Sequence, residues 1–287
     1  MATVLMPLPS LDFDPTEAAV SWKVLRAAGH TVVFATPDGE RSAADDMMIT
    51  GEGLDPWGFV PGLKKLKVLG GILRANADGR AAYAELEQDA AFQKPLRHDE
   101  ARAEDFDGFV LPGGHRARGM RPYLESAALQ ALVVRAFELD KPVAAVCHGV
   151  LLAARSISPK TGRSVLHGRR TTSLTWSQEH LASSLGRVAR FWDGSYYRTY
   201  ADEPGQACGH MGVQAEVTRA LANPSDFVEV PKDAVDHGKK TDGRHRDSMA
   251  DERPAFVVQD GRYVSARWPG DVHTFAKTFA KLLPATT

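Results

Sequence analysis

The sequence predicts an α/β fold, in which a doubly wound, mostly parallel sheet lies between two layers of helices. Three short apolar segments, partly β-branched, each lead into a turn and then a helical pattern, and this alternation is typical of parallel sheets. The three segments are residues 3–8, 106–111 and 142–146. A hairpin and a closing helix near the C-terminal end complete the expected fold.

The regular pattern is interrupted twice, so we expect a single α/β domain over residues 1–287 that carries two irregular insertions. Glycine and proline break the first interrupted stretch into turns. The second stretch is largely polar but contains five crowded aromatic residues between Phe191 and Tyr200, which we expect to form a small separate core. The expected core comprises residues 1–38, 104–186 and 254–284, and the expected insertions are residues 39–103 and 187–253.

The first 36 residues predict a β-α-β unit. A strand over residues 3–8 is followed by Asp14 as a helix cap, a proline at the first helical position and Glu17 at the third. Gly29 ends the helix, and residues 31–35 form a second strand. Glu17 has two interpretations here, because it fits a capping box with Asp14 as well as it fits a functional carboxylate.

The remaining elements follow in order. They are polar helical segments around 79–93, strands at 106–111 and 142–146, helices at 124–139 and from residue 150, a turn at 158–162, an extended segment at 165–173, a helix at 176–185, a hairpin of 254–259 and 263–267 around Asp260-Gly261, and a final helix at 272–283.

Composition excludes several classes of protein. Hydrophobic residues make up 43% of the chain, charged residues 25%, and the formal net charge is -1. No basic cluster is interleaved with aromatic residues, so we expect no nucleic-acid partner. Two cysteines without zinc-type spacing predict neither a disulfide scaffold nor a metal site. We find no signal-peptide pattern and no apolar run of a transmembrane helix, so we expect a cytoplasmic protein with no membrane partner.

The most informative segment runs from residue 141 to 156, KPVAAVCHGVLLAARS. A buried-strand pattern reaches Cys147 and changes at once to a helical pattern, so Cys147, His148 and Gly149 must form the corner between them. A cysteine at such a corner faces the N-terminal end of the following helix, where the positive dipole favours a thiolate. A buried structural cysteine is the alternative interpretation.

Other groups can serve this thiol because parallel strands end at a common edge of the sheet. Gly113-Gly114 follows one strand, and its backbone N–H could join that of His148 in an oxyanion hole. A plain turn is the alternative. Glu179 begins a later helix, where a carboxylate also gains from the helix dipole alone. Nucleophilic catalysis requires one acid near the thiol and one that orients His148, and the spacing does not show which carboxylate has which role.

Four segments together resemble the PfpI/ThiJ superfamily, whose fold is that of the class I glutamine amidotransferases and is flavodoxin-like. They are AVCHG, LPGGH, a glutamate early in the first helix, and ARWPGDVHTFAKTFAKLL. The resemblance is nearest to the branch of glutathione-independent glyoxalases and chaperones. It implies that Cys147 is the nucleophile, that Glu17 hydrogen-bonds it, that Gly114 and His148 form the oxyanion hole, and that Glu179 completes a triad with His148.

The resemblance also implies an activity. We expect a glyoxalase III-like lyase that converts methylglyoxal to lactate, or a related deglycase with a role in stress, without metal or organic cofactor and as a homodimer. A cysteine amidase or peptidase acting on amides, and a hydratase of small molecules, use the same corner. A redox-sensing holdase chaperone is a third class, in which Cys147 is oxidised instead of turning over substrate.

Overall fold

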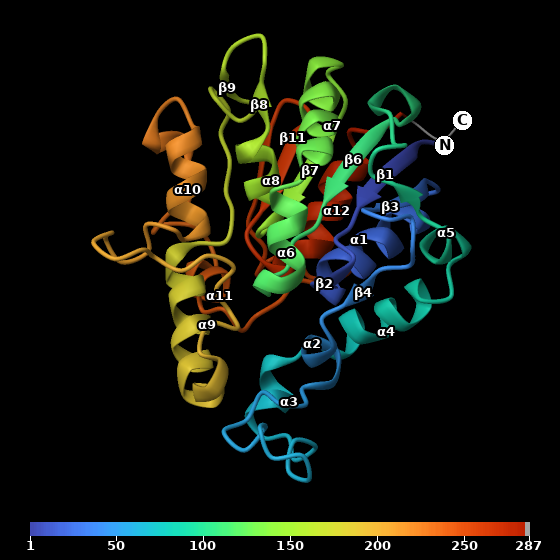
Figure 1. Cartoon of the computed structure of the whole chain (residues 1–287). Coiled ribbons are helices and arrows are strands. Elements are labelled where there is room, and N and C mark those ends of the chain that lie inside the picture. Colours follow the sequence, from blue (N-terminus) through green and yellow to red (C-terminus); the bar gives the residue numbers. More distant parts are fainter. Residues whose placement is uncertain (285–287) are drawn as a thin grey trace.

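The computed structural model describes residues 1–284 and has a seven-stranded sheet with helices on both faces (Figure 1). The strand order is β10-β11-β7-β6-β1-β3-β5, and only the β10–β11 pair is antiparallel. The strands of this sheet are β1 (Thr3–Pro7), β3 (Thr31–Thr36), β5 (Leu96–Arg97), β6 (Gly108–Leu111), β7 (Val143–Val146), β10 (Val257–Asp260) and β11 (Tyr263–Ala266). The predicted doubly wound α/β fold is therefore confirmed.

Four short strands lie outside the main sheet and form two pairs. Strand β2 (Leu11–Phe13) pairs with β4 (Ala43–Ala44), and β8 (Ile157–Ser158) pairs with β9 (Arg163–Ser164). The helices are α1 (Pro15–Ala27), α2 (Asp46–Thr50), α3 (Leu69–Leu73), α4 (Ala77–Leu86), α5 (Ala90–Gln93), α6 (Ala117–Leu124), α7 (Ala127–Glu138), α8 (Gly149–Arg155), α9 (Trp176–Ala189), α10 (Val213–Ala220), α11 (His237–Thr241) and α12 (Val272–Ala280). Within residues 1–284, no helix combines the length and apolar character needed to cross a membrane.

The central strands are apolar throughout because both faces of the sheet are covered. In β1, Val4 and Met6 belong to one hydrophobic core and Leu5 belongs to the other. This period of two follows from the pleat of a strand. Helices α1, α4 and α12 lie on one face, and α6, α7, α8 and α10 lie on the other. Both layers end near the carboxyl edge of β1, β6 and β7.

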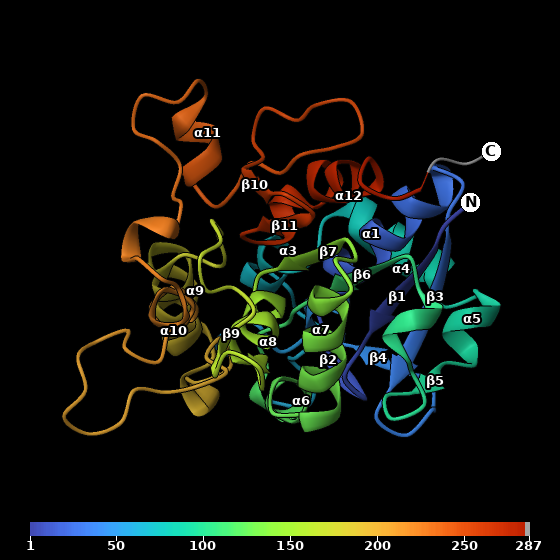
Figure 2. The same cartoon turned by 90° about the horizontal axis from the view of Figure 1, so that it is seen from above.

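The expected insertions are joined to this core rather than separated from it. The first contributes α4, which packs along α1, and β5, which extends the sheet beside β3. The second contains α10 and α11, and Figure 2 shows α9, α10 and α11 on the side of the sheet opposite to β5. The aromatic group only partly forms the separate core that was expected, because Tyr196 and Tyr197 are buried with Met47 while Phe191 is exposed.

Three sequence predictions need correction in detail. The expected hairpin is present, but its two-residue loop is Gly261-Arg262, since Asp260 still pairs with Tyr263. Gly261 has φ 58°, which suits a glycine in a tight turn. Helix α6 was not expected, because Pro122 lies inside it and the sequence before it reads as a turn. The segment 165–173, which was expected to be extended, contains no β-strand, and only Thr171 forms an isolated bridge.

Candidate active site

Cys147 lies at a sharp corner between β7 and α8. Its φ is 55°, a left-handed conformation that costs a non-glycine residue on the order of 1 kcal/mol and tends to occur at functional sites. The corner is held from outside, because the Cys147 N–H donates to the Ala266 carbonyl of β11 at 3.1 Å. Gly149 allows α8 to start here, since a Cβ on it would stand 2.0 Å from the Leu111 carbonyl oxygen. The strand-to-helix corner predicted from the sequence is present.

Glu17 is fully buried and reaches the same point from α1. Its Oε2 accepts the Gly113 N–H at 2.7 Å, while its Oε1 is buried and has no hydrogen-bond partner within residues 1–284. Asp14 caps α1 by accepting the N–H groups of Thr16 and Glu17. The Glu17 side chain makes no reciprocal hydrogen bond to the Asp14 N–H, which donates to the Gly113 carbonyl instead. Glu17 therefore does not complete a capping box with Asp14.

The thiol and the Glu17 carboxyl share a buried, negatively charged environment. Burial, followed by the charge of Asp14, raises the pKa of Glu17 well above its usual range. Burial, followed by the charges of Glu17 and Asp14, raises the pKa of the Cys147 thiol. The backbone N–H of His148 acts in the opposite direction but is outweighed. Burial and the neighbouring carboxyls thus raise the pKa of the thiol although the corner faces the start of α8, so the expectation that the corner favours a thiolate is wrong for the free protein.

His148 lies beside the Cys147 thiol, with its Nδ1 3.4 Å from the Cys147 Sγ. Burial, followed by the positive charges of His115, Arg155 and Arg198, lowers the pKa of His148 to about 3. The ring is therefore neutral at physiological pH and accepts a proton poorly. The pKa of the Glu17 carboxyl is shifted the other way, well above its usual range.

Glu179 does not contact His148. Its Oε1 pairs with the Arg198 Nε at 3.1 Å, and its Oε2 accepts the Val213 N–H at 2.9 Å. Both Glu179 and Arg198 are buried, so solvent has little access to this ion pair. Sequence reasoning missed Arg198 because it lies in the second insertion, where no spacing pattern links it to Glu179.

We expect Glu179→Gln to lower stability more than activity. The amide keeps one acceptor but removes the charge opposite Arg198, which Asp202 then pairs alone at 3.3 Å. A loss of about 1–3 kcal/mol in the free energy of unfolding is expected for a weakened buried hydrogen bond to a charged group. Urea unfolding and turnover measured on the same preparation check this. A fall in turnover of about 100-fold (~2.7 kcal/mol) at unchanged stability would instead support the triad with His148.

The glycine turn after β6 packs directly against the start of α8. A Cβ on Gly113 would stand 2.8 Å from the His148 nitrogen, so no other residue fits there without a shift. The N–H of Gly113 is taken by Glu17. By contrast, the N–H groups of Gly114 and His148 donate to no oxygen or nitrogen atom of residues 1–284. Of these two groups, the His148 N–H acts on the Cys147 sulfur, whereas the Gly114 N–H has no acceptor within residues 1–284.

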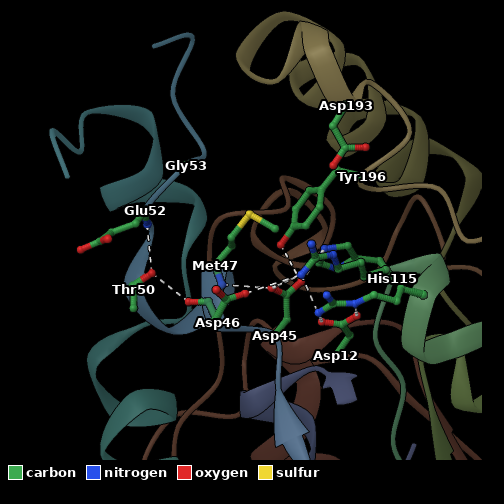
Figure 3. Close-up of polar contacts among 12 residues, drawn as sticks. Asp12, Asp45, Asp46, Met47, Thr50, Glu52, Gly53, His115, Asp193 and Tyr196 are labelled. Carbon is green, nitrogen blue, oxygen red and sulfur yellow. Dashed lines mark hydrogen bonds and ion pairs between the residues drawn. The ribbon is translucent and has the colours of Figure 1, made fainter. Parts of the chain in front are cut away.

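The two insertions meet beside this turn, at residues that the sequence did not single out. Asp45 accepts the Tyr196 hydroxyl at 2.6 Å and lies 3.7 Å from the His115 Nε2 (Figure 3). Asp45 belongs to the first insertion and Tyr196 to the second, while His115 directly follows Gly114. The contact thus fixes the insertions against the glycine turn. In the part of the chain that the structure describes, no group of three His, Cys, Asp or Glu side chains is placed to hold a metal ion.

Comparison with known proteins gives a consistent result. A sequence model of the family described as ThiJ/PfpI family-like matches residues 8–204. A deglycase from Thermococcus kodakarensis is 30% identical over 237 residues, covering 77% of this chain and 94% of that protein. A deglycase from Pyrococcus abyssi is 26% identical over 190 residues, covering 66% and 69%.

Solved structures show the same fold at lower identity. The Rapid Encystment Protein 24 KDa of Francisella tularensis has a TM-score of 0.58 at 13% identity and covers 99% of this chain and 100% of its own. Glyoxalase III from Candida albicans has a TM-score of 0.55 at 18% identity, with 99% and 98% covered. At this level of identity, the likeness concerns the fold alone.

Proposed function

The chain belongs to the ThiJ/PfpI family, and from this premise we propose that it is a cysteine-nucleophile enzyme acting on small reactive carbonyl compounds. The proposed activity is a glyoxalase III-like conversion of methylglyoxal to lactate, or a related deglycase activity. The observation that carries the proposal is the Cys147 thiol at a strained corner, with the buried carboxyl of Glu17 held by Gly113 in the glycine turn that packs against this corner. The deglycase names of the relatives from Thermococcus and Pyrococcus support the class of substrate.

In the proposed mechanism, the Cys147 thiol gives its proton to the Glu17 carboxylate as the sulfur adds to the aldehyde carbon of methylglyoxal, and Glu17 later returns that proton to the oxyanion. The carbon–sulfur bond forms as the carbonyl becomes an oxyanion, which the N–H groups of Gly114 and His148 would stabilise, and protonation gives a hemithioacetal. Glu17 then removes the proton on the former aldehyde carbon. The resulting enediol is reprotonated on the adjacent carbon, which leaves a thioester of lactate on Cys147.

Water completes the cycle by attacking the thioester carbonyl, so that the carbon–sulfur bond breaks and lactate leaves with the thiol restored. Oxidation of one carbon and reduction of its neighbour cancel, so no external oxidant or reductant is consumed. Glu17 fits the proton transfers because its raised pKa lies closer to a working pH than that of an exposed carboxyl. His148 contributes its backbone N–H and a neutral ring beside the sulfur.

The experiment that tests this function is incubation of the pure protein with methylglyoxal and no added cofactor, followed by an enzymatic assay for D-lactate and intact-mass measurement. We expect lactate above the uncatalysed rate and a transient adduct of one methylglyoxal. Undetectable turnover by folded protein would reject the proposal. Release of ammonia or an amine from amide substrates would favour the amidase or peptidase, and suppression of aggregation that survives Cys147→Ala would favour the holdase.

A further inference from the structure

A cationic side chain beside the proposed active site has no partner. Within residues 1–284, the Arg246 guanidinium makes no hydrogen bond or ion pair, and its Nη1 is buried. A buried donor without an acceptor costs on the order of 1–3 kcal/mol, and more when it is charged. Such a group in a native structure calls for an explanation, for example an acceptor that arrives with a ligand.

The position of Arg246 is set by contacts on both sides of it. The Asp247 N–H donates to the Gly270 carbonyl at 2.8 Å, and the Asp247 carboxylate accepts the Thr274 N–H at 2.7 Å. This fixes the segment on the first turn of α12. The Arg246 Cζ lies 5.0 Å from the centroid of the Trp268 ring. Arg246 is therefore held in place although nothing accepts its hydrogen bonds.

Those same contacts bring Arg246 close to the nucleophile. Trp268 follows β11 by two residues, and the last residue of β11, Ala266, accepts the Cys147 N–H. On the other side, the positive charge of Arg246 acts on Glu17 and Asp14, lowering the pKa of each against the larger effect of burial. Arg246 thus lies within electrostatic reach of the buried carboxyl of Glu17.

The carboxyls of Asp14, Glu17, Asp247 and Asp271 act on this charge, but none of them pairs with the guanidinium within residues 1–284. Burial raises the pKa of Glu17, whose carboxyl accepts the Gly113 N–H instead. Asp247 is engaged with α12, and Asp271 pairs with Arg267 at 2.7 Å. The buried Arg246 Nη1 therefore keeps a donor without an acceptor, and in a buried environment such a cationic donor attracts an anion more strongly than in water.

We propose that Arg246 binds a carboxylate of the substrate and so selects carbonyl compounds that carry one, holding their carbonyl carbon over the Cys147 thiol. The carbonyl part of this inference rests on the proposed function, whereas the preference for an anion does not. A guanidinium suits the task because its planar fork donates two parallel hydrogen bonds to a carboxylate. The Trp268 ring keeps the plane of the fork fixed.

The test compares two alkylating reagents of nearly equal size, iodoacetate and iodoacetamide, which differ in a carboxylate. In each reaction the thiolate displaces iodide and forms a carbon–sulfur bond, so neither needs a carbonyl group. Peptide mass spectrometry follows the rates at Cys147 and at Cys208, which is exposed and serves as an internal reference. We expect the ratio of the iodoacetate rate to the iodoacetamide rate to be at least about tenfold higher at Cys147, as one charge-assisted contact provides.

Variants separate recognition from general effects on the thiol. Arg246→Gln should lower the ratio at Cys147 to that at Cys208, and Arg246→Lys should retain most of the preference. Arg244→Gln is the matched control, since Arg244 is exposed two residues earlier and its side chain makes no hydrogen bond within residues 1–284. A change in thiol acidity alters both rates alike and leaves the ratio unchanged. An equal ratio at both cysteines, or a ratio that Arg246→Gln does not alter, would overturn the inference.

A binding measurement provides a second readout that needs no reaction at sulfur. Calorimetric titration should show pyruvate binding at least about tenfold more tightly than the neutral pyruvamide, and the difference should vanish in Arg246→Gln. Methylglyoxal turnover is measured on the same proteins. A retained anion preference without turnover rejects the proposed function alone, while turnover without any anion preference rejects the role of Arg246 alone.

Discussion

Replacing Cys147 with alanine is expected to abolish turnover of methylglyoxal, with a fall of roughly 10³-fold or more. The thiol is the only group in the proposed mechanism that bonds covalently to the substrate, and no neighbouring side chain can take over that bond. The fold should survive, because alanine is smaller and the corner is held by the hydrogen bond from residue 147 to Ala266. The measurement is initial-rate lactate formation, with the thermal unfolding midpoint as a check on folding.

Cys208 offers the matched control for this prediction. It is exposed and is the second cysteine of the chain, so Cys208→Ala should leave turnover unchanged. Cys147→Ser should be as inactive as the alanine variant, since a hydroxyl is far less acidic than a thiol. If Cys147→Ala retained turnover within a factor of about ten, the covalent route would be wrong and Glu17 alone would have to catalyse the isomerisation.

Glu17→Gln is expected to lower turnover by roughly 10²-fold or more, the usual contribution of a positioned acid–base group. Glutamine can still accept the Gly113 N–H through its amide oxygen, so the geometry of the turn is preserved. What it cannot do is take or give a proton beside Cys147. Lactate formation measures the loss, and intact-mass detection of the methylglyoxal adduct should show that binding at sulfur persists.

The same substitution should stabilise the protein at neutral and alkaline pH. The pKa of Glu17 is raised in the folded state, so its contribution to stability is fully present below the unfolded value of 4.5 and is lost as pH rises through the folded pKa. Glutamine does not titrate, so the variant loses no stability in this way as the pH rises. We expect a rise in Tm at pH 8 of about 2–4 °C, the shift that ~1 kcal/mol gives in a chain of this size, and no rise at pH 4.

Thermal unfolding at several pH values tests this second effect independently of activity. A Tm difference between the two proteins that does not grow with pH would show that Glu17 titrates normally in the folded state. A loss of stability at every pH would show instead that the carboxylate is needed to hold Gly113. Together with turnover, these outcomes distinguish two roles for Glu17. It is either a catalytic carboxyl whose burial lowers the stability of the protein, or a structural carboxyl that stabilises the fold.

The corner at Cys147 and the layout of the sheet could be predicted because local patterns encode them. The change from a strand pattern to a helical one at residue 147 leaves no other place for the turn, and both neighbours of the corner are regular elements. Glu17 could be noticed but not interpreted, because its hydrogen bond crosses 96 positions in the chain to Gly113. Only packing decides between a capping role and a place beside the thiol.

The expected partner of His148 shows the opposite case. Glu179 lies in the first turn of a helix as expected, yet its carboxylate pairs with Arg198 from an irregular loop instead of with His148. Arg246 also lies in an irregular stretch, and neither its burial nor its contact with Trp268 has a periodic signature. Irregular segments are placed by tertiary contacts rather than by propensity, and so their charges cannot be assigned to a site in advance.

The sequence by itself therefore determined the doubly wound sheet, the corner that carries Cys147 and the glycine turn facing it, because hydrophobic period and turn chemistry act over a few residues. Only the tertiary structure decided the charge around the thiol. Burial and the distance between charges set the pKa of each group, and both depend on which distant side chains the fold brings together. For this reason the position of Cys147 at a strand-to-helix corner was predictable, while the charges around it and the burial of Arg246 were not.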